Sequence, residues 1–230
     1  MAEILRCVEV ETDGAVTSAV IWLHGLGADG HDFEPIVPHL GLDGLGVRFV
    51  FPHAPRRAVS INMGLLMPAW FDVRDLDFRG QPDLKGLSES AAQVEALIAR
   101  EQERGVDERR VVLAGFSQGG ALALHVALRA KVPPAGVVAL STFMLEDPAD
   151  RSTSARPAGF FPIFQAHGTD DPMIPASLGE ITRDRLQALG YPITFKTYPM
   201  QHEVCAEEIA DIGAFLRSRV LDPKAAAPKA

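Results

Sequence analysis

A serine stands between glycines in the stretch GFSQGG, residues 115–120. The apolar run VVLA precedes this stretch, and the helix-like run ALALHVALRA follows it. A G-x-S-x-G pattern at a strand-to-helix junction is typical of a tight turn that presents a nucleophilic serine. Gly115 and Gly119 suit such a turn because a Cβ two residues from the serine would collide with it. The pattern therefore predicts that Ser117 is a nucleophile rather than only a helix cap.

A serine hydroxyl needs a general base, and the base needs a carboxylate that orients it. Where the serine occupies such a turn, an acid and then a histidine follow it along the chain, which leaves His125, His167 and His202. His125 lies about two turns into the following helix, where its ring cannot point back to the helix start. His167 ends a strand directly before an acidic pair, which suits a structural role in a turn. His202 follows the last expected strand, so we predict that it is the base.

The stretch HGTDDP, residues 167–172, offers Asp170 and Asp171 as the orienting acid. Both follow a strand directly, at the end of a parallel sheet where ligand sites form. Two adjacent aspartates ahead of a proline could also form an Asx turn without any chemistry. Other aspartates in this part of the chain lie in less ordered or helical contexts: Asp147, Asp150 and Asp184. Only one of the adjacent pair can face His202, and the pattern alone leaves the choice open.

Short apolar runs alternate with helical patterns along the chain. The runs predict strands at residues 19–25, 47–53, 111–117, 136–141, 162–168 and 193–199. The 3.6-residue apolar rhythm predicts helices at 88–105, 118–131, 177–189 and 203–220. This alternation indicates an α/β fold, with a mostly parallel central sheet and helices on both faces. Two long irregular stretches, 54–87 and 142–161, are candidates for pocket walls or a lid.

Composition limits the classes of function. The 230 residues are 47% hydrophobic and 23% charged, which predicts one globular domain over residues 1–220, followed by a disordered tail, 221–230. A formal charge of −8 disfavours nucleic acid as a partner, because binding phosphates requires a basic surface. The chain shows no leader pattern and no apolar run of about 18 residues, so we expect a cytoplasmic protein without stable membrane insertion. Cys7 and Cys205 form no disulfide framework, which suits a reducing compartment.

Five ordered stretches resemble the carboxylesterase, lysophospholipase and acyl-protein thioesterase family of small α/β-hydrolases. They are IWLHGLGADGHDF (21–33), FPHAPRRAVSINMGLLMPAWFDV (51–73), GFSQGGALAL (115–124), HGTDDPMIP (167–175) and YPMQHEVCAEEI (198–209). The similarity runs from about Ala19 to Leu216 and implies an α/β-hydrolase fold with a minimal cap. In this family the acid directly precedes the proline, which implies Asp171. Ser117 and His202 match the family's nucleophile and base.

The resemblance also implies an oxyanion hole formed by two backbone amides, Leu26 N–H and Gln118 N–H. A tetrahedral intermediate carries negative charge on the former carbonyl oxygen, and losing one donor typically costs about 2.7 to 4 kcal/mol. The glycines of HGLGADG suit a loop that approaches a substrate closely. A dinucleotide site is disfavoured, because GLGADG lacks the following helix and the acidic residue of that fingerprint.

The irregular stretches contain large apolar residues that we expect to line a groove for an acyl chain: Leu65, Trp70 and Phe143. Any one of these side chains could instead belong to the ordinary core. The large residues of NMGLLMPAW are expected to block a deep tunnel. No spacing of histidines and carboxylates resembles a metal site, and the chemistry needs no cofactor.

Together these features predict a serine carboxylesterase that hydrolyses short to medium acyl esters through an acyl-enzyme intermediate. An acyl-protein thioesterase or a lysophospholipase is the alternative enzyme, since either would use the same site on a different leaving group. A hydrolase-like binding module is the alternative outside enzymes, although a module has no need of Ser, Asp and His in this order. Relatives often pair as dimers, which leaves a homodimer open.

Overall fold

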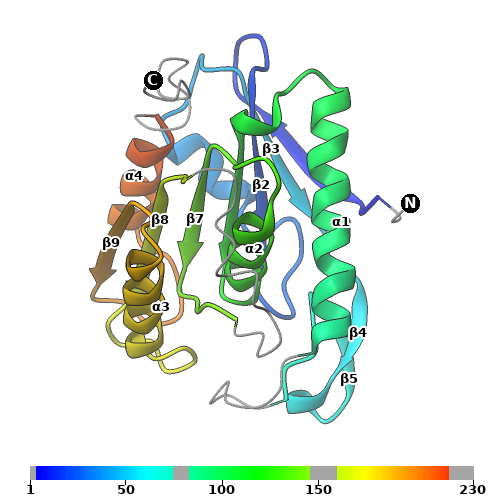
Figure 1. The fold of residues 1–230 in the computed structure, drawn as a ribbon, viewed down its shortest axis with the longest axis vertical. Helices are drawn as coiled ribbons and strands as arrows, with labels where there is room; N and C mark the ends of the chain where they lie inside the picture. The colour runs from blue at the N-terminus through cyan, green and yellow to red at the C-terminus, as the bar shows by residue number, and fades with distance from the viewer. Residues whose placement is uncertain (1–3, 75–82, 146–159, 218–230) are drawn as a thin grey trace.

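A seven-stranded sheet crosses the centre of the molecule in the order β1-β3-β2-β6-β7-β8-β9 (Figure 1). The computed structural model describes residues 4–74, 83–145 and 160–217. β1 (Cys7–Glu11) pairs antiparallel with β3 (Val47–Pro52), and the other neighbours pair parallel. The remaining strands are β2 (Ser18–Leu23), β6 (Val111–Phe116), β7 (Gly136–Leu140), β8 (Ile163–Gly168) and β9 (Ile193–Tyr198). The predicted, mostly parallel sheet is confirmed.

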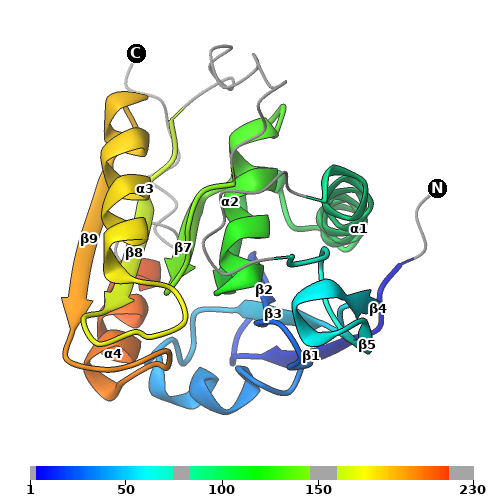
Figure 2. The ribbon, with the colours of Figure 1, turned by 90° about the horizontal axis from the view of Figure 1, so that it is seen from below.

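Helices cover both faces of this sheet, as predicted. Three lie on one face: α1 (Leu84–Glu103), α2 (Gln118–Arg129) and α3 (Ala176–Ala188). On the other face lie α4 (Ala206–Phe215) and the 3-10 helix η1 (Glu34–His39) (Figure 2). Each face has its own apolar core, one beneath α1, α2 and α3 and one beneath α4 and η1. Every residue of β2, β3, β7 and β8 is buried, because these strands lie between the two cores.

Three strands were missed by the sequence patterns. β4 (Arg56–Val59) and β5 (Leu65–Pro68) form an antiparallel hairpin inside the stretch that was expected to be irregular. β1 is a half-exposed edge strand that alternates apolar and acidic residues, so it lacks the continuous apolar run of the central strands. Its Glu9 carboxylate pairs with Arg100 of α1 and with Arg104 directly after that helix, at 2.8 and 2.9 Å. Ion pairs with a distant helix thus hold this edge, and a local pattern does not reveal them.

The first helix begins four residues before the predicted position. Asp83 caps α1, and its side chain accepts a hydrogen bond from the Gly86 N–H at 3.0 Å. The same carboxylate accepts from the Asp72 N–H at 3.0 Å, which ties the segment after the hairpin to the helix. An aspartate caps a helix as well as a serine does, so the start predicted at residue 88 was too late. The predicted tail, 221–230, and most of the second irregular stretch lie outside the described residues.

α4 buries a carboxylate, Glu208, that is 0% exposed. Neither of its oxygens meets a hydrogen-bond partner of normal geometry among the described residues. Burial, with the Asp211 carboxylate nearby, raises the pKa of Glu208 from 4.5 to about 8. The folded protein therefore binds this proton more tightly than the unfolded chain does. Stability from this group is fully present below the unfolded value and is lost as the pH rises toward the folded value.

We predict that Glu208→Gln flattens the pH dependence of stability, because the neutral amide has no proton to lose. The wild-type free energy of unfolding should fall by up to about 1.4 kcal/mol per pH unit between pH 5 and 8. Urea unfolding at both pH values measures this loss. Glu207→Gln, a change at the exposed neighbouring residue, is the matched control and should keep the wild-type slope. Equal slopes for the wild type and Glu208→Gln would contradict the prediction.

Candidate active site

Ser117 is the single residue between the end of β6 and the start of α2. Its backbone has φ 54° and ψ −120°, a conformation that non-glycine residues rarely adopt. The Ser117 N–H donates to the Leu140 carbonyl at 2.9 Å, and the Ser117 carbonyl accepts from Thr142 Oγ1 at 2.6 Å. Contacts with the end of β7 therefore hold the strained turn. This is the geometry expected of a nucleophile between a strand and a helix.

The two glycines of the G-x-S-x-G pattern are required by packing. A Cβ on Gly115 would overlap the carbonyl group of Gly119, four residues further on. A Cβ on Gly119 would overlap the carbonyl oxygen of Leu23 at the end of β2. The turn therefore fits closely against the neighbouring strand only without these side chains, as the sequence predicted.

Asp171 and His202 meet from two different loops. His202 Nδ1 lies 2.7 Å from Asp171 Oδ2, and the Asp171 carboxylate is buried. Asp171 Oδ1 accepts from the N–H groups of Met173 and Ile174, at 2.8 and 2.9 Å. Asp170 is exposed, and its carboxylate accepts from its own neighbour Thr169 at 3.1 Å. The geometry thus pairs the histidine with Asp171, the member of the acidic pair that the resemblance implied.

The imidazole of His202 lies beside the serine turn. Its ring centroid is 4.6 Å from that of Phe116, the residue immediately before Ser117. Because a carboxylate can only accept, the contact with Asp171 assigns the proton to Nδ1 and leaves a lone pair on Nε2. The other two histidines do not take this place, since His125 lies within α2 and His167 is fully buried on β8.

The loop after β2 passes directly against Ser117. A Cβ built on Gly25 would lie 3.7 Å from the Ser117 Cβ. The Ala28 N–H donates to the Gly25 carbonyl at 3.3 Å, and Gly27 has φ 81°, which together define a type II turn. Leu26 is the second residue of this turn, so its N–H takes no part in the hydrogen bond that closes it.

The second predicted donor, the Gln118 N–H, belongs to the first residue of α2. The first four N–H groups of a helix have no acceptor within the helix, and they lie at the positive end of its dipole. Both amides implied by the resemblance therefore come from segments that flank Ser117. The oxyanion hole they would form remains a prediction.

Sequence reasoning missed the side chains that support this loop. His24 is buried, and its Nε2 accepts from the Ala54 N–H at 3.1 Å while Nδ1 lies 2.7 Å from the Gly25 carbonyl. Burial lowers the pKa of His24, which keeps the ring neutral and suits one donating and one accepting nitrogen. The indole of Trp70 donates to the His24 carbonyl at 2.9 Å. The histidine of HGLGADG was the sequence signal for this support of the loop.

The Gln118 side chain has a separate structural role. Its Oε1 accepts from the Trp70 N–H at 2.8 Å, and its Nε2 donates to the Phe71 carbonyl at 2.8 Å. Both contacts are buried and join the start of α2, directly after Ser117, to the segment after the hairpin. The sequence signal for this structural role was a polar residue, glutamine, directly after Ser117.

The structure does not bring the three predicted groove residues together. Trp70 is 0% exposed and Phe143 is 7% exposed, and both belong to the core beneath α1, α2 and α3. Their role as substrate contacts stays a prediction that this burial disfavours, because a side chain packed in the core offers little surface to an acyl chain. Leu65 differs, since it is 64% exposed on β5.

The hairpin that carries Leu65 adjoins the loop after β2. The Gly27 N–H donates to the Pro68 carbonyl at the end of β5, at 2.9 Å. Met63 and Leu66, on the same hairpin, are also exposed. Exposed apolar side chains therefore lie on a hairpin whose end contacts the segment that contains Leu26.

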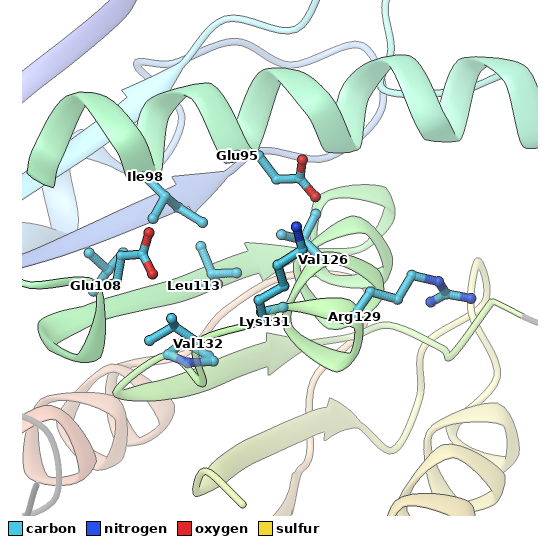
Figure 3. Close-up of a pocket in the computed structure, with 11 residues that line it drawn as sticks. Glu95, Ile98, Glu108, Leu113, Val126, Arg129, Lys131 and Val132 are labelled. Carbon is cyan, nitrogen blue, oxygen red and sulfur yellow. The ribbon is translucent and has the colours of Figure 1, made fainter. Parts of the chain in front are cut away.

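A cavity of about 240 Å³ lies far from this site, between α1 and α2 (Figure 3). Its lining includes Val111, the first residue of β6, and Lys131, just beyond the end of α2. Ser117 follows the opposite end of β6, six residues and about 20 Å away. The cavity is therefore not the catalytic pocket.

Among the described residues, no group of three or more His, Cys, Asp or Glu side chains could hold a metal ion. In the same part of the chain, no helix has the length and apolar character needed to cross a membrane.

The sheet topology and the order of Ser117, Asp171 and His202 along it are those of an α/β-hydrolase, and structural neighbours share this fold. Residues 6–220 match the family model described as phospholipase/carboxylesterase, and the chain belongs to this family of serine hydrolases. The resemblance predicted from the five motifs is thus confirmed.

Relatives match nearly the full length of the chain. Acyl-protein thioesterase 1 of Neurospora crassa is 39% identical and covers 91% of this chain and 89% of the relative. Acyl-protein thioesterase 1 of Cryptococcus neoformans var. neoformans serotype D (strain JEC21) is 37% identical, over 94% of this chain and 98% of the relative. Among solved structures, SOBER1 of Arabidopsis thaliana has a TM-score of 0.81 and 31% identity, over 89% of this chain and 99% of that chain. Acyl-protein thioesterase 2 of Zea mays has a TM-score of 0.81 and 27% identity, over 94% and 99%.

Proposed function

We propose that this serine hydrolase is an acyl-protein thioesterase, which releases an acyl group held as a thioester on a protein cysteine. The observation that carries the proposal is the identity of 37 to 39%, over more than nine-tenths of the chain, to proteins of that name. The sequence motifs favoured short to medium acyl esters and kept the thioesterase as the alternative. The relatives support that alternative better.

In the proposed mechanism Ser117 Oγ attacks the thioester carbonyl while His202 Nε2 takes its proton. The tetrahedral intermediate then collapses, the C–S bond breaks, and His202 returns the proton to the leaving thiolate. Water attacks the acyl-serine ester with His202 as base again, which releases the carboxylic acid and restores Ser117. Asp171 keeps the His202 proton on Nδ1 and stabilises the imidazolium that forms in both steps.

We assign stabilisation of the intermediate to the Leu26 and Gln118 N–H groups. The close approach of Gly25 to Ser117 supports this assignment for the loop, and the position of Gln118 at the start of α2 supports it for the helix. Fixed amides of this kind need no reorganisation when the negative charge develops. The side chains of His24 and Gln118 hold the two segments in place.

We place the acyl chain against the exposed apolar side of the hairpin, with Leu65 as a contact. Leu66 is exposed on the opposite face of the hairpin, because successive side chains of a strand alternate, and Met63 is exposed in the turn between β4 and β5. The end of β5 adjoins the loop that contains Leu26. Each methylene buried there contributes about 0.8 kcal/mol. The expected block to long chains rested on large residues filling a tunnel, but Leu65 and Leu66 face outward and Trp70 is in the core. Chain length is therefore limited less than the sequence suggested.

Matched substrates test the proposal. One peptide carries a palmitoyl or octanoyl group as a thioester on cysteine, and its partner carries the same group as an oxyester on serine. We expect kcat/KM to favour the thioester by about tenfold or more, a difference of about 1.4 kcal/mol in the barrier, because a thiolate is the better leaving group. We also expect palmitoyl to equal or exceed octanoyl.

A p-nitrophenyl ester series from acetate to palmitate runs in parallel and reports chain length with a constant leaving group. Equal rates on the matched thioester and oxyester, together with a maximum at acetate or butyrate, would restore the short-chain carboxylesterase and sink the thioesterase. Ser117→Ala in each assay gives the background rate.

A further inference from the structure

The carboxylate of Asp171 lies between two imidazoles. His202 Nδ1 is 2.7 Å from Oδ2, and His167 Nε2 is 3.6 Å from the same oxygen. The mechanism above uses only the first of these rings. The second is 0% exposed at the end of β8, four residues before Asp171. A buried titratable side chain so close to the catalytic acid needs a physical explanation.

One contact fixes the proton of His167. Its Nε2 lies 2.8 Å from the Ile174 carbonyl oxygen, which can only accept, so Nε2 carries the hydrogen. Nδ1 is buried, and none of the described residues offers it a hydrogen bond. α3 packs directly on this edge of the ring, because a Cβ on Gly179 would reach Nδ1. A second proton would therefore be buried without an acceptor.

Burial, rather than the neighbouring charges, disfavours a cation at His167. Burial lowers the pKa of His167, the Asp171 and Glu180 carboxylates act in the opposite direction, and the His202 ring adds to the lowering. A cation at this position would attract the same carboxylate that stabilises the His202 imidazolium. A neutral donor can hold the loop without competing for that charge.

Ile174 connects this donor to the catalytic acid. Its carbonyl accepts from His167, while its N–H donates to Asp171 Oδ1 at 2.9 Å. Ile174 is thus held by His167 of β8, and Ile174 in turn holds the Asp171 carboxylate. We propose that His167 is a positioning residue for catalysis, which fixes Ile174 and thereby aims the Asp171 carboxylate at His202. The inference rests on the proposed roles of Asp171 and His202.

Three variants separate positioning from mere packing. His167→Leu keeps the volume buried but loses the donor, and His167→Gln keeps an N–H donor near the place of Nε2. Gln165→Leu is the matched control, because Gln165 is buried two residues earlier on β8 and donates to the Gly179 carbonyl at 2.7 Å. It supports the same helix without contacting the acid loop.

We expect His167→Leu to lower kcat by about 10- to 100-fold with KM nearly unchanged, because a small misplacement of a catalytic group has effects of this size. His167→Gln should recover kcat to within about threefold of wild type. Gln165→Leu should lower the thermal midpoint and leave kcat near wild type. The downfield proton resonance of the Asp171–His202 hydrogen bond should persist in His167→Gln and Gln165→Leu and weaken in His167→Leu.

If His167→Leu does not fold, His167→Asn takes its place, since its shorter amide cannot reach Ile174. Equal kcat values for the donor-deleting variant and Gln165→Leu would overturn the inference, and so would failure of His167→Gln to recover activity while folded. Asp171→Asn in the same assay distinguishes failure of the positioning role of His167 from failure of the proposed role of Asp171. Full activity of Asp171→Asn would reject the proposed role of Asp171 itself. Loss of activity in Asp171→Asn together with unchanged activity in His167→Leu would reject only the positioning role of His167.

Discussion

Ser117→Ala should lower kcat by more than about a thousandfold while the protein remains folded. The change removes one oxygen atom, and the backbone contacts that hold the turn, to Leu140 and Thr142, do not involve it. Without Oγ no acyl-enzyme can form, and only binding and the oxyanion donors would remain. Turnover of an acyl thioester, with thermal unfolding measured in parallel, checks both halves of this expectation.

Ser141→Ala is the matched control for that substitution. Ser141 also has a positive φ, 43°, and it directly follows β7, the strand next to β6. Its Oγ is buried, and none of the described residues hydrogen-bonds it. Ser141→Ala should therefore keep activity near wild type. Activity of Ser117→Ala above about a thousandth of wild type would show that Ser117 is not the nucleophile.

Asp171→Asn should lower kcat by about 10⁴-fold, the size expected when the base is held in the wrong tautomer. The amide oxygen of asparagine can still accept from Met173 and Ile174, so the loop can keep its conformation. The amide NH₂ would then face His202 Nδ1, which must accept. The ring proton moves to Nε2, and a protonated Nε2 cannot take the proton of Ser117.

Asp170→Asn is the adjacent control, with the same change of charge and an exposed side chain. We expect it to retain kcat within about twofold of wild type, as surface changes usually do. Single-turnover rates on a thioester substrate compare the two variants without the contribution of product release. Equal losses of kcat, or a larger loss for Asp170→Asn, would show that Asp171 is not the acid that orients His202.

The central strands and the turn at Ser117 could be predicted because their signals are local. A strand with a core on both sides is mostly apolar, and β6 and β7 are so throughout, whereas β2 begins with Ser18 and β8 carries the buried polar residues Gln165 and His167. Ser117 lies at a strand-to-helix junction with required glycines. His202 was selected by its position late in the chain. The choice between Asp170 and Asp171 came from the family resemblance, because adjacent residues share the same local pattern.

The misses came from interactions that join distant segments. The start of α1 depends on Asp83, which also holds the segment at Asp72. Trp70 was predicted to line a groove, but its indole donates to the His24 carbonyl and its backbone amide to the Gln118 side chain. The sequence alone does not show whether a large aromatic side chain in a loop faces a substrate or the core. Only packing decides between them.

The central claim is that Ser117 carries the acyl group of a thioester substrate during turnover. The most direct measurement is rapid acid quenching of the wild-type protein with a palmitoyl thioester peptide, followed by mass spectrometry of the digested protein. We predict a palmitoyl adduct on the peptide that contains Ser117, formed with release of the thiol and absent from Ser117→Ala. An adduct on another residue, or thiol release from Ser117→Ala at the wild-type rate, would contradict it.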